Sequence, residues 1–111
     1  MFQEKRRHER ISMNNRCLVY YGNNEIQGEV IDISEGGIGI DISQPIDSDS
    51  ISITFIEDDP TFVKVYKNCV YTLNARVVRT FDGVYGCVMK PSADIIKYID
   101  NKKCTRLMNI C

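Results

Sequence analysis

Short segments in which apolar and polar residues alternate strictly are the feature that most constrains the fold of this chain. The clearest are residues 38–42, IGIDI, and residues 51–55, ISITF. Successive side chains of a strand point to opposite faces, so this period of two is typical of strands with one buried and one exposed face. The chain is therefore expected to be built mainly from half-buried β-strands.

Further segments extend this pattern, because they are rich in β-branched and aromatic residues and are bounded by turn signals. The expected strands cover residues 17–21, 26–33, 38–42, 51–55, 69–81 and 84–90. Residues 22–24 and Asp82-Gly83 are each expected to close a hairpin, and residues 57–60 are expected to form a loop. The segment 69–81 is long for one strand, which predicts a bulge or bend near Asn74.

After Pro91 the pattern changes to that of a helix. Ser92 is an expected N-cap and Asp94 falls in the first turn, which predicts a helix over residues 92–111. Its apolar residues form two groups that face different directions: Ile95, Ile96 and Ile99, then Cys104, Leu107, Met108 and Cys111. Either the helix breaks at the polar residues 100–103 or it contacts two surfaces. Packing against the rest of the domain at both faces is preferred over a dimerisation face at the second.

Together these elements predict a single all-β domain, a six-stranded antiparallel β-barrel capped by the C-terminal helix. The chain has 111 residues, enough for one domain with its own core. We expect a flexible N-terminal arm over residues 1–15, the barrel over 16–90 and the helix over 92–111. No segment has the run of apolar residues that a membrane span needs, so membrane insertion is not expected.

Composition excludes several classes of function. The net charge is −1, so no overall field points to nucleic acid or membrane partners. Five cysteines, an odd number without zinc-ligand spacing, and the single histidine His8 predict a reduced cytoplasmic protein without a metal site. No nucleophile lies beside His8 in the sequence, so an enzyme is not expected.

Residues 4–10, EKRRHER, carry a dense cluster of basic side chains. Arg6 and Arg10 are separated by three residues, with Lys5 and Arg7 beside them. A guanidinium is a planar fork that binds a phosphate or the O6/N7 edge of guanine through two hydrogen bonds. Taken alone, the cluster is weak evidence, because most short basic runs are solvated termini.

Residues 32–37, DISEGG, offer complementary chemistry. The Asp32 carboxylate can accept from the N1–H and N2–H₂ donors of guanine, and the Ser34 hydroxyl can donate or accept. Gly36 and Gly37 permit positive φ and a close approach of ligand to backbone. A tight turn explains this stretch by itself. Together with the arginines, it describes a site for a guanine nucleotide.

The two motifs, Arg6-x-x-x-Arg10 and Asp32-x-Ser34-x-x-Gly37, resemble the PilZ domain, the bacterial receptor for cyclic di-GMP. The resemblance covers essentially the whole chain, including the order of arm, barrel and helix. It implies that Arg6 and Arg10 contact phosphates and the Hoogsteen edge of guanine. It also implies that Asp32 and Ser34 contact the guanine and its neighbouring phosphate, and that Gly37 shapes the turn.

The resemblance also implies a stoichiometry. In similar proteins a basic residue directly before the first arginine accompanies two stacked ligands, so Lys5 and Arg7 favour two cyclic di-GMP molecules per chain over one. Arg76 and Arg79 lie on the long predicted strand and could extend the basic surface, although solvation explains them more simply.

The expected function is a non-enzymatic cytoplasmic receptor whose N-terminal arm changes conformation on binding cyclic di-GMP. It would thereby regulate an effector protein in motility, exopolysaccharide production or virulence. One alternative is a PilZ-like interaction barrel that binds no nucleotide. Another is a single-stranded nucleic-acid binder resembling an OB fold, with exposed stacking platforms. Candidate platforms are Tyr20, Tyr21, Tyr66, Tyr71 and Tyr85, but nucleic acid is not the expected partner.

Overall fold

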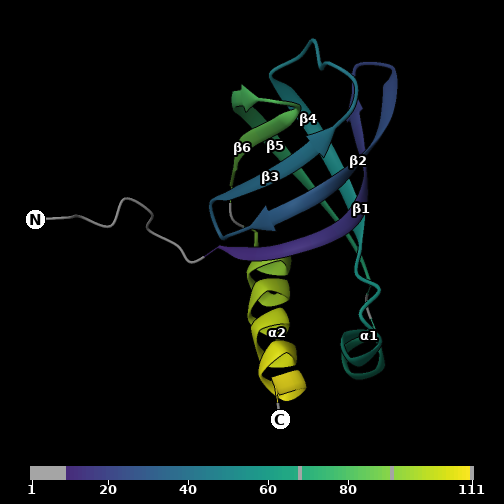
Figure 1. The fold of residues 1–111 in the computed structure, drawn as a ribbon, viewed down its shortest axis with the longest axis vertical. Helices are drawn as coiled ribbons and strands as arrows, with labels where there is room; N and C mark the ends of the chain where they lie inside the picture. Colours follow the sequence, from purple (N-terminus) through teal and green to yellow (C-terminus); the bar gives the residue numbers. More distant parts are fainter. Residues whose placement is uncertain (1–9, 68, 91, 111) are drawn as a thin grey trace, which may run out of the picture.

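The computed structural model describes residues 10–67, 69–90 and 92–110 (Figure 1). Six antiparallel strands form a closed barrel in the order β1-β2-β3-β6-β5-β4. The strands are β1 (Ile11–Tyr21), β2 (Asn24–Ile33), β3 (Gly37–Ile42), β4 (Ser50–Ile56), β5 (Val70–Phe81) and β6 (Val84–Met89). The structure confirms the predicted six-stranded antiparallel barrel followed by a C-terminal helix.

The alternating segments place their apolar residues inside the barrel. The inward residues of β3 and β4 are Ile38, Ile40, Ile42, Ile51, Ile53 and Phe55, all of them buried. The positions between them face outward; on β3 these are Gly37, Gly39 and Asp41, of which Asp41 is exposed and the two glycines are covered by neighbouring atoms. A closed barrel pairs every strand on both sides and leaves no free edge.

Strand β1 begins at Ile11, so the arm predicted over residues 1–15 is too long. Ile11 and Met13 point into the core. Asn15 follows them in the same inward row, and its Nδ2 donates to the backbone oxygen of Ile56 at 2.7 Å. This buried amide interrupts the apolar alternation, so the sequence pattern starts later than the strand does. The barrel thus covers residues 11–89 rather than 16–90.

The predicted irregularity in the long strand β5 lies further along than expected. Asn74 pairs regularly with Ser52. The register instead shifts between Val77 and Arg79, opposite β6. The extra residue brings Arg79 to the outer face, where regular alternation after Arg76 would have turned it inward.

A short helix, α1 (Pro60–Tyr66), lies in the connection between β4 and β5 and was not predicted. Only residues 57–59 of the expected loop 57–60 precede it. The Asp59 carboxylate caps the helix by accepting from the Thr61 N–H at 2.9 Å, and Pro60 occupies the first turn. Phe62 is fully buried against the end of the barrel.

The C-terminal helix α2 (Ala93–Ile110) is continuous through residues 100–103. Ser92 caps it as predicted, with its Oγ accepting from the Ile95 N–H at 3.2 Å. The helix lies beneath the barrel beside α1 (Figure 1). Three buried side chains hold it there, and they are Ile95, Tyr98 and Ile99.

The second apolar face of α2 does not pack on the barrel, so the preferred interpretation was wrong for its described residues. Cys104 is exposed, and Leu107 is 66% exposed. Lys102 and Thr105 are buried in their place. The reason is electrostatic: the Lys102 ammonium lies 2.9 Å from the Glu57 carboxylate at the barrel end, which turns this side of the helix inward.

Glu57 is the centre of a buried polar network that joins the end of β4 to both helices. Its Oε1 accepts from the Tyr98 hydroxyl at 2.6 Å and pairs with Lys102, while Oε2 accepts from the Asp59 N–H at 3.0 Å. Burial alone would raise the pKa of Glu57. The hydrogen bonds from Tyr98, Lys102 and Asp59 and the Lys102 charge outweigh burial and hold that pKa below its usual value.

Candidate ligand-binding site

Strands β1 and β2 bring Arg10 next to Asp32. Ser12 pairs with Asp32 across the two strands, which places the residue just before β1 at the end of β2. Arg10 Nη1 lies 2.7 Å from Asp32 Oδ1, and the two side chains are 25% and 29% exposed. The partly desolvated pair fixes the carboxylate, while Oδ2 has no hydrogen-bond donor among the described residues. That oxygen can accept from a ligand.

The turn from β2 to β3 is held by backbone hydrogen bonds. The Ser34 N–H donates to the Gly37 oxygen at 2.8 Å, and the Met89 N–H donates to the Gly36 oxygen at 3.1 Å. Ser34 is buried, and its Oγ lies 3.5 Å from the Gly37 oxygen, at the limit of a hydrogen bond. The turn is therefore anchored to β6, and the Ser34 hydroxyl lies beside it.

Neither Gly36 nor Gly37 lies in the left-handed region that the sequence suggested for them; among the described glycines, Gly22 and Gly83 do. Gly37 is instead required by close approach. A Cβ on Gly37 would lie 3.1 Å from the backbone oxygen of Cys87 and 3.7 Å from Arg10 Nη2. The tight contact is the one with the β6 backbone, whereas the Arg10 nitrogen lies at an ordinary van der Waals distance.

Two further glycines, Gly39 and Gly86, form a flat patch that we call the glycine floor. They pair across β3 and β6 at outward-facing positions, where Gly39 is buried beneath Asp32 and Gly86 is partly buried beneath Arg79. A Cβ on Gly39 would lie 2.9 Å from Asp32 Oδ1, and one on Gly86 would lie 2.9 Å from Arg79 Nε. These glycines were not singled out in the sequence. The sequence signal that could have found them is a glycine at an outward-facing position of a predicted strand, because such a glycine marks a place where other atoms approach the backbone closely.

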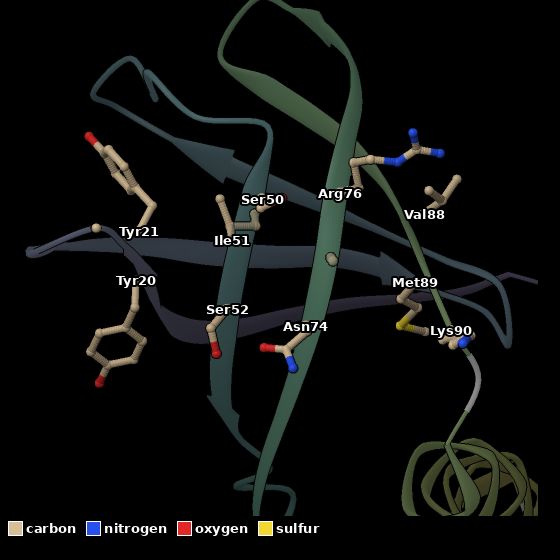
Figure 2. A pocket seen from close by; sticks show the side chains of 12 residues that line it. Tyr20, Tyr21, Ser50, Ile51, Ser52, Asn74, Arg76, Val88, Met89 and Lys90 are labelled. Atoms are coloured by element: carbon tan, nitrogen blue, oxygen red, sulfur yellow. The ribbon is translucent and has the colours of Figure 1, made fainter.

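Arg76 and Arg79 border the floor from β5. Arg76 pairs with Val88 of β6, and Arg79 pairs with Gly86. Figure 2 shows the Arg76 side chain on the same side of the strands as Val88. Among the described residues, neither arginine has a carboxylate at ion-pair distance.

A hollow of about 760 Å³, lined in part by Arg76, lies over β1, β4, β5 and β6 (Figure 2). Its polar lining includes Tyr20, Ser52, Asn74 and Lys90. Asp32 and Ser34 do not line it. The hollow meets the turn of the motif through Val88, because Val88 pairs with Gly37 on one side and with Arg76 on the other.

The structure thus brings together those predicted site residues that it describes. Arg10, Asp32, Ser34, Gly36 and Gly37 converge where the start of β1 meets the β2–β3 turn. The other predicted residues, Lys5, Arg6 and Arg7, lie outside the described residues. The proposed roles of these three basic residues remain predictions.

The tyrosines proposed as platforms for nucleic acid are mostly turned inward. Tyr71 and Tyr85 are buried, and Tyr66 packs against Phe62 with ring centroids 4.7 Å apart. Tyr20 and Tyr21 line the hollow of Figure 2. A continuous row of exposed aromatic rings, which the single-stranded nucleic-acid hypothesis requires, is not formed by these five side chains.

The described cysteines form no disulfide with one another. Burial raises the pKa of Cys87 to about 11, and burial together with the Glu29 charge does the same for Cys17, so both stay protonated. Within the described residues, no three His, Cys, Asp or Glu side chains gather in a way that could hold a metal ion. Neither described helix is long and apolar enough to cross a membrane.

Comparison with known proteins decides the family. The sequence model described as PilZ domain matches residues 4–101, a stretch that contains both motifs. The chain belongs to the PilZ domain family. No match was found among curated proteins.

A solved structure has a similar fold. The "Structure of Bacillus subtilis Inhibitor of motility (MotI/DgrA)" matches with a TM-score of 0.69 and 14% sequence identity. The match covers 96% of this chain and 52% of that chain, so the present chain spans about half of the neighbour's length. At this identity the likeness concerns the fold.

Proposed function

We propose that this PilZ domain is a cyclic di-GMP receptor that regulates an effector protein, with its site on the outer face of β2, β3 and β6. The observation that carries the proposal is the Arg10–Asp32 pair beside the Ser34–Gly37 turn. These are the residues that the family's motifs assign to the ligand. Their convergence supports a binding role over the alternative of an interaction barrel without nucleotide.

Each group has a definite part in the proposed complex. Asp32, oriented by Arg10 through Oδ1, accepts from the N1–H and N2–H₂ of guanine with its other oxygen. Arg10 binds a phosphate or the Hoogsteen edge with the guanidinium nitrogens left free by the pair. Arg6, outside the described residues, adds a second guanidinium. Ordering of the arm around the ligand then changes the surface that the effector protein contacts.

Titration calorimetry with cyclic di-GMP tests the proposal. The wild type should bind, and cyclic di-AMP, whose adenine lacks the N1–H donor, should bind at least a hundredfold more weakly because polar groups of the site stay unpaired. Asp32→Asn should weaken cyclic di-GMP binding at least tenfold. Glu25→Gln, an exposed acid at the far end of β2, is the matched control and should bind as the wild type does.

Two results would contradict the proposal. Absence of cyclic di-GMP binding by the folded wild type would favour an interaction barrel that binds no nucleotide. Equal binding of the two cyclic dinucleotides would show that Asp32 does not distinguish guanine from adenine.

A further inference from the structure

One row of residues crosses four strands on the outer face of the barrel. Asp32 of β2 pairs with Gly39 of β3, Gly39 with Gly86 of β6, and Gly86 with Arg79 of β5. Neighbouring strands lie about 4.8 Å apart, so the path from Asp32 to Arg79 along the curved barrel wall is about 14 Å. The row therefore has a carboxylate at one end, a guanidinium at the other and no side chain between them.

The two side chains at the ends lean over the glycine floor from opposite sides. Asp32 Oδ1 lies 2.9 Å from the point where a Cβ of Gly39 would be. The Cγ, Cδ and Nε atoms of Arg79 lie 3.0, 3.5 and 2.9 Å from the corresponding point of Gly86. The stem of Arg79 thus crosses from β5 onto β6, toward the motif residues. An Arg79 side chain that was only solvated would not need to point toward β6.

Charge distinguishes the two ends of the row. At the Asp32 end, Arg10 is already paired with the carboxylate. At the other end, Arg79 and its neighbour Arg76 have no ion-pair partner within the described part of the chain. Arg76 belongs to the adjacent outward row, where it pairs with Val88 and Val88 pairs with Gly37. Two uncompensated cations therefore border the floor opposite Asp32.

We propose that Arg79, assisted by Arg76, contacts the part of the bound nucleotide that is turned away from Arg10 and Asp32. The inference rests on the proposed function. A cyclic dinucleotide has two bases and two phosphates, and Asp32 and Arg10 lie together at one end of the row, so groups at the other end can bind the half of the ligand that these two do not reach. The Arg79 guanidinium can bind a phosphate through two hydrogen bonds or stack on a purine. It is a binding residue that lies outside both motifs.

Titration of cyclic di-GMP into four proteins tests the assignment. Arg79→Ala should bind at least tenfold more weakly than the wild type, because a charge-assisted contact is lost. Arg79→Lys should recover only part of that loss, since an ammonium lacks the planar fork. Arg16→Ala is the control: Arg16 is also exposed on the outer face, but on β1 opposite Glu29. It should bind within twofold of the wild type.

The outcomes distinguish a failure of the Arg79 assignment from a failure of the proposed binding of cyclic di-GMP. If the wild type binds and Arg79→Ala binds within twofold of it, the inference is overturned and the proposed function stands. If the folded wild type does not bind, both are overturned. Thermal unfolding checks that each variant is folded. Arg79→Gln, which retains a long stem but no charge, replaces the alanine variant should that variant unfold, and it should show the same tenfold loss.

Discussion

At the scale of single residues, Gly39 shows how closely the proposed site is built onto the backbone. Its missing side chain makes room for Asp32, whose Oδ1 lies 2.9 Å from the position that a Cβ would take. Gly39 is not in the left-handed region, so an alanine there is compatible with the strand. The alanine side chain would instead displace the Asp32 carboxylate from its observed position.

Gly39→Ala is therefore expected to weaken cyclic di-GMP binding at least fivefold while the barrel stays folded. Calorimetry measures the affinity and thermal unfolding measures the stability. Gly28→Ala is the contrasting variant, because its Cβ would meet the backbone oxygen of Asp41 at 2.9 Å and should mainly lower the unfolding midpoint. Unchanged affinity in Gly39→Ala would show that the observed position of Asp32 is not needed for binding.

Much of the site could be predicted residue by residue, because its motifs are local in sequence. Asp32, Ser34 and Gly37 lie within six positions, and a turn between two strands brings such residues together without long-range information. Arg79 was expected on the barrel exterior and is exposed, but strict alternation along β5 after Arg76 does not place it there. Its outward position depends on the bulge after Val77, whose place is set by pairing with β6.

At the scale of elements, the buried network around Glu57 determines how α2 lies against the barrel. Glu57 and Lys102 are 1% and 7% exposed, and the Tyr98 hydroxyl completes the network. Removing one partner of a buried ion pair leaves the other charge uncompensated, which typically costs about 3–5 kcal/mol.

Lys102→Met should thus lower the free energy of unfolding by about 3 kcal/mol or more, measured by urea denaturation at pH 7. Lys97→Met, at an exposed position earlier in α2, should change it by less than about 0.5 kcal/mol. Equal stability of the two variants would mean that the network does not hold the helix.

The same network predicts a dependence of stability on pH. The folded state lowers the pKa of Glu57 below its ordinary value of 4.5, so the charged form contributes stability above that pH. This contribution is lost as the pH falls through the folded pKa. Urea denaturation of the wild type and Glu57→Gln between pH 6 and pH 3 should show that the wild type's advantage narrows below about pH 4.5. A constant difference over that range would contradict the assigned charge state.

Elements with regular local patterns were predictable, and elements that depend on distant contacts were not. The strands around 38–42 and 51–55 show strict alternation, and the Ser92 cap marks the start of α2. The early start of β1 was missed because the buried side-chain amide of Asn15 donates its hydrogen bond to the backbone oxygen of Ile56, which lies 41 positions away in the sequence. Helix α1 has a capping signal in Asp59-Pro60, but its seven residues give little periodicity.

At the scale of the whole molecule, the start of β1 connects the proposed site to α2. Arg10 and Ser12 flank the start of β1, and the Arg106 side chain of α2 donates to the backbone oxygen of Ser12. Ser12, two residues after Arg10, is therefore held by a helix whose Leu107 is exposed. A shift of Ser12 on ligand binding would alter this contact with α2.

The number of bound ligands is a further property of the whole molecule. Two stacked cyclic di-GMP molecules carry four phosphate charges, and Lys5 and Arg7 add to the two arginines of the motif. We expect a calorimetric stoichiometry of two per chain, and Lys5→Leu should shift it toward one. A ratio of one for the wild type would contradict the role given to these basic residues.

Backbone amide NMR during a cyclic di-GMP titration would show whether the ligand binds over the motif turn and the glycine floor. The largest shift changes should fall on Asp32, Ser34, Gly37, Gly39 and Gly86, with little change at Leu18 and Thr54, which pair across β1 and β4 on the opposite side of the barrel. Changes confined to the hollow lined by Tyr20 and Asn74, or spread evenly over the barrel, would contradict binding over the motif turn and the glycine floor.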